Sequence, residues 1–302
     1  MRVIQRHPIS LDDCFFYHTI DIPGVGLMRG QWDLRSSADA YLGGISLANR
    51  RVLEIGPASG FLTFVMEQRG ADVVACELPH GSQWDLVPYA GADLSDYIRD
   101  REALHRRLVN GFWFGHRAFR SRSNVVYSPV YDLPREVGTV DLATFSMVLR
   151  HLREPFRALE AVQAHVKTHL VITELFPWGL MPTEIQAELS PRQLPPSVAH
   201  EPYGAASASV ARLIAAQPPV AWFAPDAERQ QPRDTWWDLT PSVLCQFLGV
   251  LGFHVVSERY HFQVHDPSYQ WTKPQGEVLR PTYHPCFTIV GERTRQERSS
   301  RP

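Results

Sequence analysis

Two acidic residues and a glycine-containing turn are the groups of this chain best suited to hold a small ligand. Residues 51–60 read Arg-Val-Leu-Glu-Ile-Gly-Pro-Ala-Ser-Gly, and a second apolar run ends at Glu77. Gly56 and Gly60 let the main chain come close to a ligand, and a helix that begins at such a turn exposes backbone N–H groups. Glu77 stands where strand–helix–strand units bind ribose hydroxyls. The spacing predicts a nucleotide-type site.

The glycine count and the charge of Glu54 argue against a phosphate ligand. A dinucleotide site needs Gly-x-Gly-x-x-Gly because a pyrophosphate rests on the helix N-terminus. The run from Gly56 to Gly60 keeps only its two end glycines. Glu54 adds a negative charge just before the turn, which would repel a diphosphate and attract a cationic group. An ordinary strand–helix connection is the alternative for two glycines and an acid.

Strands and helices alternate around these residues. Apolar runs predict strands at 52–55, in a run ending at 77, and at 125–127, 140–145, 170–174, 253–262 and 286–291. Helical spacing predicts helices after residue 60, from about 94 to 108, from 155 onward and from 241 to a glycine at 252. This order predicts an α/β fold with a seven-stranded, mostly parallel sheet whose last two strands form a hairpin.

The run Glu54-x-Gly56-x-x-x-Gly60 resembles motif I of class I S-adenosylmethionine (SAM) dependent methyltransferases, with Glu77 as the acidic ribose ligand. A closer resemblance is to the branch that includes tRNA wobble-uridine carboxymethyltransferases and bacterial small-molecule methyltransferases. It rests on residues 32–35 (Trp-Asp-Leu-Arg), 145–147 (Phe-Ser-Met) with His151 and Pro155, and 236–241 (Trp-Trp-Asp-Leu-Thr-Pro). The resemblance implies a Rossmann-like fold and methyl transfer from SAM.

The resemblance also implies a set of cofactor contacts. In the family, the run after the third strand cradles adenine; here Pro129 replaces the usual acidic residue, so backbone atoms of the next two residues, or Asp132, would take its place. Arg35 offers two parallel donors to the cofactor carboxylate, or else forms a surface ion pair with Asp33 or Asp39. The expected contacts are Arg35, Glu54, Gly56, Ser59, Gly60, Glu77, Leu78, Val130, Tyr131 and Ser146.

Two histidines and three tryptophans are candidates for the reaction and the substrate. His151 follows the fourth strand, and its imidazole would serve either as a general base or as a packing residue of its loop. His116, in the aromatic run 111–116, is the second candidate. The side chains of Trp113, Trp178 and Trp237 would form walls for a flat or apolar substrate, or belong to the core. No cysteine pair or His-Glu-x-x-His run supports a metal site.

Composition bounds the partners. The chain has 302 residues, 30 of them basic, and a net charge of −2, so no global excess attracts a polyanion. A small-molecule substrate is therefore the first expectation, and a catalytically inactive fold in a complex is a further possibility. RNA is the alternative, for which a basic face would come from Arg99, Arg101, Arg106, Arg107, Arg117, Arg120 and Arg122. The same arginines, interleaved with acids, would otherwise form a solvated helix face.

Location and domain organisation follow from the same features. Four widely spaced cysteines predict reduced thiols in a cytoplasmic protein, and neither a signal peptide nor a membrane-spanning run is expected. We expect an N-terminal extension (1–44), a SAM-binding core (45–175), a return to the core sheet (236–292) and a flexible tail (293–302). Prolines crowd residues 176–235, which form a lid over the sheet or a tolerated surface insertion.

Overall fold

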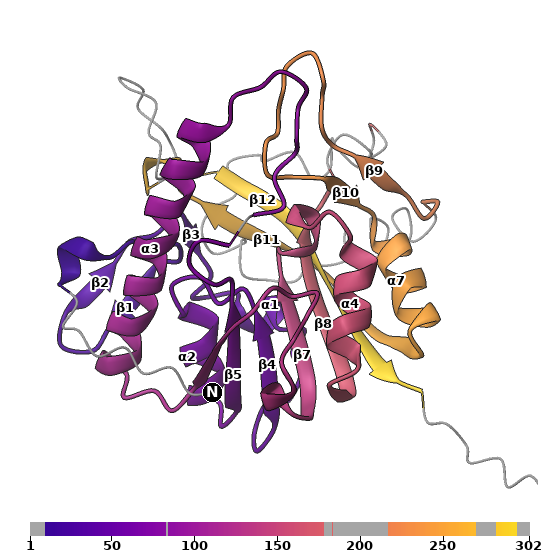
Figure 1. Cartoon of the computed structure of the whole chain (residues 1–302). Coiled ribbons are helices and arrows are strands. Elements are labelled where there is room, and N and C mark those ends of the chain that lie inside the picture. Colours follow the sequence, from indigo (N-terminus) through magenta and orange to yellow (C-terminus); the bar gives the residue numbers. More distant parts are fainter. Residues whose placement is uncertain (1–9, 83, 178–182, 184–216, 270–281, 295–302) are drawn as a thin grey trace, which may run out of the picture.

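A mixed sheet runs through the centre of the computed structural model (Figure 1), which describes the chain except for residues 1–9, 83, 178–182, 184–216, 270–281 and 295–302. Its strands are β3 (Trp32–Asp33), β4 (Arg51–Ile55), β5 (Asp72–Glu77), β6 (Asn124–Tyr127), β7 (Val140–Ser146), β8 (Val166–Leu175), β11 (Phe253–His265) and β12 (Thr282–Arg293). They lie in the order β3-β11-β12-β8-β7-β4-β5-β6. β12 pairs antiparallel with both neighbours, whereas β4 to β8 pair in parallel.

The predicted α/β fold and its seven strands are confirmed, and an eighth strand extends the sheet. β11 continues past the predicted end at residue 262, so that Val264 and His265 pair with Asp33 and Trp32 of β3. The strand at Trp32 was not predicted, because two residues are too few to show the alternation of apolar and polar side chains that indicates a strand. The addition ties the N-terminal part of the chain to the closing hairpin.

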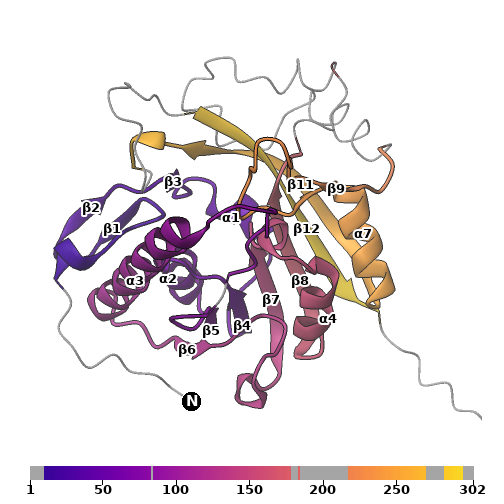
Figure 2. The ribbon, with the colours of Figure 1, turned by 45° about the horizontal axis from the view of Figure 1, so that its top comes forward.

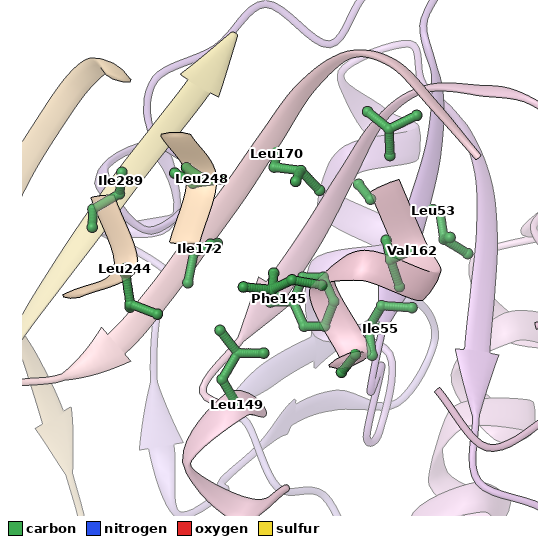
Figure 3. Packing of buried hydrophobic residues seen from close by; sticks show 14 of the residues in the cluster. Leu53, Ile55, Phe145, Leu149, Val162, Leu170, Ile172, Leu244, Leu248 and Ile289 are labelled. Atoms are coloured by element: carbon green, nitrogen blue, oxygen red, sulfur yellow. The ribbon is translucent and has the colours of Figure 1, made fainter. Parts of the chain in front are cut away.

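Successive strand residues supply two apolar layers, since side chains alternate between the faces of a sheet. One layer includes Leu53 and Ile55 and lies under α4 (Pro155–Gln163) and α7 (Pro241–Val250); Figure 3 shows this packing, with Phe145 at its centre. The other includes Val52 and lies under α1 (Ala38–Tyr41) and α2 (Phe61–Gln68). Figure 2 shows these helices on opposite sides of the sheet.

Helix α3 (Ser95–Ala118) continues ten residues past its predicted end at residue 108. The aromatic run 111–116, expected after the helix, forms its last turns. Gly111 lets the N-terminal segment pack closely against the helix, because a Cβ at this position would lie only 2.7 Å from the carbonyl oxygen of Phe15. A Cβ at Gly115 would meet the Phe64 ring at 2.7 Å. The glycines that suggested a break are sites of close packing.

The N-terminal segment runs along α3 to the turn after β4. Arg107 of α3 donates hydrogen bonds from Nη2 to the carbonyl oxygens of Asp12 (3.1 Å) and Cys14 (2.8 Å). The backbone N–H of Tyr17 then donates to Ser59 Oγ (3.0 Å). A small ribbon of β1 (Ile20–Ile22) and β2 (Gly26–Met28) follows. The described part of the predicted extension therefore shares the core and reaches the glycine turn.

A buried chain of hydrogen bonds fastens α1 to the sheet. Ser37 Oγ donates to Gln263 Oε1 (2.6 Å), and Gln263 Nε2 donates to His261 Nδ1 (2.7 Å). His261 Nε2 lies 2.8 Å from the hydroxyl of Thr288, which is 2.7 Å from that of Thr173. Burial lowers the pKa of His261 to about 3, so its neutral ring fits a chain in which each nitrogen has one partner.

Removing the amide of Gln263 should destabilise the fold without touching the ligand site. We expect Q263L to lower the free energy of unfolding by about 1–3 kcal/mol, because Ser37 and His261 lose buried partners. Urea denaturation measures the change. V256T, at an exposed position of the same strand, is the control, with an expected change below about 0.5 kcal/mol. Equal stability of both variants would contradict a structural role for this network.

Candidate active site

The turn between β4 and α2 contains three residues with positive φ: Gly56 (73°), Ala58 (50°) and Gly60 (89°). A Cβ at Gly56 would lie 2.9 Å from Val148, which follows β7, and one at Gly60 would lie 2.7 Å from the Phe64 ring. Both glycines are thus required by conformation and by packing. Ala58 holds the same left-handed conformation at a cost of about 1 kcal/mol or more, a strain that is typical of ligand-binding turns.

Glu54 is buried under this turn and accepts a hydrogen bond from the hydroxyl of Thr63 in α2. Burial raises its pKa from 4.5 to about 8, against the opposing effect of Thr63. At neutral pH the side chain is therefore mostly protonated. The sequence-based expectation of a full negative charge beside the turn is wrong, and the glycine count remains the argument against a pyrophosphate.

Glu77 ends β5 at the carboxyl edge of the sheet. Its Oε1 accepts the N–H of Leu78 (2.7 Å) and lies 3.4 Å from Nε2 of His105 in α3. The rings of His80 and Trp84 pack against His105. Sequence reasoning missed these aromatic neighbours, because they lie on the long connection after β5 and in the middle of a helix. The acid predicted to bind ribose therefore stands beside a group of rings.

The run after β6 forms a compact turn. The Ser128 hydroxyl donates to the carbonyl oxygen of Asp132 (2.6 Å), and the Tyr131 hydroxyl donates to Asp85. Among the residues that the structure describes, no hydrogen bond occupies the backbone N–H of Val130 or Tyr131. These amides are the groups that the sequence assigns to the adenine edge, and their geometry is compatible with that assignment.

Past Ser146, at the end of β7, the chain makes a strained turn into the single-turn helix η3 (Leu149–His151). Met147 holds a positive φ of 57°. Glu174, at the end of β8, accepts the N–H of Leu149 at Oε1 (2.8 Å) and also that of Arg150. The Leu149 side chain is buried in the core that Figure 3 shows. Glu174 was not identified from the sequence, where it only ended an apolar run.

His151 is oriented by the backbone of a distant segment. Its Nδ1 is hydrogen-bonded to the carbonyl oxygen of Asp234, which can only accept, so Nδ1 carries the proton and Nε2 the lone pair. Loss of hydration, followed by the positive charges of Arg150 and Arg101, lowers its pKa below 6.5. The residue is exposed to solvent, which limits this shift. A neutral ring with an available Nε2 is expected at pH 7.

Residues 231–238, which we call the strap, join two loops and helix α3 at the carboxyl edge. Arg233 O accepts the N–H of Val87 (2.9 Å), and Trp236 N–H donates to Arg150 O (2.9 Å). Asp234 forms an ion pair with Arg101 of α3. Figure 1 shows the strap segment beside the connection that follows β5. The described end of the proline-rich segment thus contacts the turn that carries His151.

Arg35 forms the surface ion pair that the sequence left as an alternative. Its Nε donates to Asp33 Oδ1 (2.8 Å) and its Nη2 to Asp33 Oδ2 (2.7 Å). This geometry uses the two parallel donors that would have met the cofactor carboxylate. Arg35 is therefore paired with Asp33 in this structure, and a cofactor carboxylate would have to compete with Asp33 or bind another donor.

The remaining candidates lie apart from His151 or have structural contacts. Trp113 is buried between α3 and the sheet and donates from Nε1 to the hydroxyl of Tyr127 (2.9 Å), so it is core rather than a substrate wall. Trp237 belongs to the antiparallel ribbon of β9 (Ala221–Phe223) and β10 (Trp237–Leu239). Its indole N–H donates to the carbonyl oxygen of Arg153 (3.0 Å). His116 lies 3.2 Å from the carbonyl oxygen of Ser123, just before β6, at the opposite end of this strand from the site. Trp178 lies outside the described residues.

Two further observations concern metals and membranes. Within the described ranges, no group of three or more His, Cys, Asp or Glu side chains could hold a metal ion. No helix in the same part of the chain has the length and apolar character needed to cross a membrane.

The raised pKa of Glu54 predicts that the free energy of unfolding falls as the pH rises. In the unfolded chain this carboxyl ionises near 4.5, and in the folded protein near 8. Stability present at low pH is therefore lost as the pH rises through this window. Between pH 5 and 8 the wild type should lose about 3 kcal/mol relative to E54Q.

Urea denaturation of both proteins at each pH measures this difference. E102Q, which removes an exposed carboxylate of α3, is the control. A difference between E54Q and wild type that stays constant from pH 5 to 8 would contradict the assignment.

The chain is similar to several known proteins. Among solved structures, the chain is similar to 1,6-didemethyltoxoflavin-N1-methyltransferase of Burkholderia thailandensis with bound S-adenosylhomocysteine (13% identity, 87% of this chain and 80% of that one, TM-score 0.45). It is also similar to magnesium protoporphyrin IX methyltransferase of Synechocystis (11%, 82% and 75%, TM-score 0.43). At these scores neither likeness informs the substrate. No curated protein matches the chain significantly.

A family model described as a methyltransferase domain matches residues 34–265. The match includes the glycine turn, Glu77, η3 and the strap, and it ends within the last residues of β11. Because it spans most of the chain, the protein belongs to this methyltransferase-domain family and is a SAM-dependent methyltransferase of the Rossmann-like α/β class.

Proposed function

We propose that the protein transfers the methyl group of SAM to an oxygen, nitrogen or carbon atom of a small, aromatic or apolar metabolite, with His151 as the general base. The observation that carries this proposal is the hydrogen bond from His151 Nδ1 to the carbonyl oxygen of Asp234. It leaves Nε2 as the proton acceptor on a turn that directly follows β7, the carboxyl edge where open α/β sheets bind ligands.

The residues at this edge suit SAM. Glu77 offers carboxylate oxygens to ribose hydroxyls, and the amides of Val130 and Tyr131 have no protein partner among the described residues. The Ser59 hydroxyl accepts the Tyr17 N–H, and no described residue accepts the hydroxyl's own hydrogen. SAM supplies a sulfonium methyl group that a nucleophile displaces in line. The main tasks of the protein are therefore positioning the acceptor and receiving its proton.

His151 is arranged for the second task. When Nε2 takes the proton of the acceptor, the ring becomes a cation that still donates from Nδ1 to Asp234 O, and this hydrogen bond strengthens as the ring gains charge. Glu174 keeps η3 in place by accepting two of its N–H groups. The base thus has a fixed tautomer and a fixed position before the acceptor binds.

RNA is a weaker candidate for the acceptor. Of the seven arginines that would form a basic face, Arg101 is paired with Asp234, Arg99 with Asp96, and Arg107 with backbone carbonyl groups. The strap also lies against the turn that carries His151, which favours a small acceptor over a folded RNA. Methyl or carboxymethyl transfer to tRNA is therefore an outcome to test rather than a second proposal.

A labelled methyl group distinguishes the two acceptors. Purified protein is incubated with methyl-labelled SAM and either a small-metabolite extract or bulk RNA, and the label is followed by mass spectrometry. We expect the label in the small-metabolite fraction, with the mass shift identifying the product. Label that enters only RNA would overturn the proposal, and so would the absence of transfer from SAM to either fraction.

Substitution of His151 should lower turnover and spare cofactor binding. We expect H151Q to reduce kcat by about 100-fold or more, the typical contribution of a general base, with an unchanged affinity for S-adenosylhomocysteine. H116Q, at the far end of β6, is the matched control and should retain kcat. The wild-type kcat should also stay level as the pH falls to about 6.5 and decline only below it, because the pKa of the base is lowered. A fully active H151Q would remove the base from the mechanism.

A further inference from the structure

We propose that Tyr17 donates a hydrogen bond to the carboxylate of the bound cofactor, the role that the sequence assigned to Arg35. The inference concerns cofactor recognition alone and does not depend on the acceptor or on His151. It starts from the ion pair between Arg35 and Asp33, which leaves the carboxylate without its expected partner.

Tyr17 is fixed to the turn that defines the cofactor site. Its backbone N–H donates to Ser59 Oγ at 3.0 Å, between the two glycines of the motif. The next residue, His18, packs its ring against Phe61, the first residue of α2. The N-terminal segment is held to α3 by Arg107, so Tyr17 is anchored on two sides. Its side chain is therefore presented from a defined backbone position.

The Tyr17 hydroxyl accepts one hydrogen bond, but its own hydrogen has no acceptor among the described residues. Its oxygen accepts the Nε1–H of Trp32 at 3.0 Å. A phenol also has one hydrogen to donate, and among the described residues no acceptor takes it. The residue is partly buried, where an unused donor is costly. A ligand oxygen would satisfy it. Trp32, the first residue of the Trp-Asp-Leu-Arg run, thus orients the phenol.

The charges around Tyr17 favour an anionic partner. The hydrogen bond from Trp32 and the positive charges of Arg101 and Arg150 oppose the rise in the pKa of Tyr17 that burial causes. Each of these arginines also forms an ion pair with an aspartate, Asp234 or Asp238, so the positive charge near the phenol is partly balanced. Two acids lie in the same region, since Glu54 and Glu174 both act on neighbouring Tyr41. Burial raises their pKa values to about 8 and about 7, so neither carries a full charge at pH 7. A carboxylate arriving beside Tyr17 therefore meets little repulsion from them.

Two ligands that differ in the amino-acid portion test the proposal. S-adenosylhomocysteine carries the carboxylate, and 5′-methylthioadenosine lacks it together with the amino group. We expect Y17F to weaken S-adenosylhomocysteine binding about 10-fold or more, as measured by calorimetry, because a hydrogen bond to a charged group is lost. Its affinity for 5′-methylthioadenosine should change less than about 2-fold.

Two variants serve as controls. Y89F removes another half-buried tyrosine hydroxyl, one that donates to the carbonyl oxygen of Pro232 in the strap, and should leave both affinities unchanged. R35A should also bind S-adenosylhomocysteine like the wild type. Thermal unfolding of Y17F checks that the fold is retained.

Several outcomes would overturn the proposal. They are an unchanged affinity of Y17F for S-adenosylhomocysteine, equal losses for the two ligands, and a loss in R35A that matches the expected loss in Y17F. A Y17F protein that binds S-adenosylhomocysteine normally but shows a raised KM for the acceptor would place the contact on the substrate instead. Failure of the wild type to bind S-adenosylhomocysteine would remove the premise.

Discussion

The arrangement of the site depends on the buried carboxylate of Glu174. It receives the N–H groups of Leu149 and Arg150, the two residues that precede His151. Those amides belong to the first turn of a short helix and have no partner within it. Burial raises the pKa of Glu174 to about 7, and these hydrogen bonds oppose that rise. The buried side chain of Leu149 and the carboxylate of Glu174 therefore fix the turn, and this position of the turn sets the position of the His151 imidazole.

The parts of the molecule that repeat with a regular period were predictable from the sequence. The strands carry continuous apolar runs, and α7 begins with Thr240 accepting the N–H of Val243 (3.3 Å) ahead of a proline at the first helical position. The two-residue β3 and the last turns of α3 were not predictable. β3 forms because β11 and the segment around His18 both pair with it. The glycines of α3 suggest a helix break unless the residues that pack against them are known.

Site residues divide in the same way. The positions of the glycines and Glu77 at the strand ends could be predicted because motif spacing fixes them on one chain segment. The contacts of Glu174, Tyr17 and the carbonyl oxygen of Asp234 could not be predicted, because each joins residues that lie far apart in the sequence. Arg35 forms the alternative contact, because a neighbouring aspartate meets its guanidinium group. Local patterns thus indicate what is bound, while tertiary contacts decide which side chains bind it.

The strap has a consequence for the order in which the enzyme becomes complete. The strands and the turn that define the nucleoside half of the site are all synthesised before residue 176, whereas the carbonyl oxygen that selects the imidazole tautomer belongs to residue 234. A nascent or truncated chain would carry the ring without the partner that orients it. If His151 is the base, proton transfer therefore requires the segment around residue 234 to be in place.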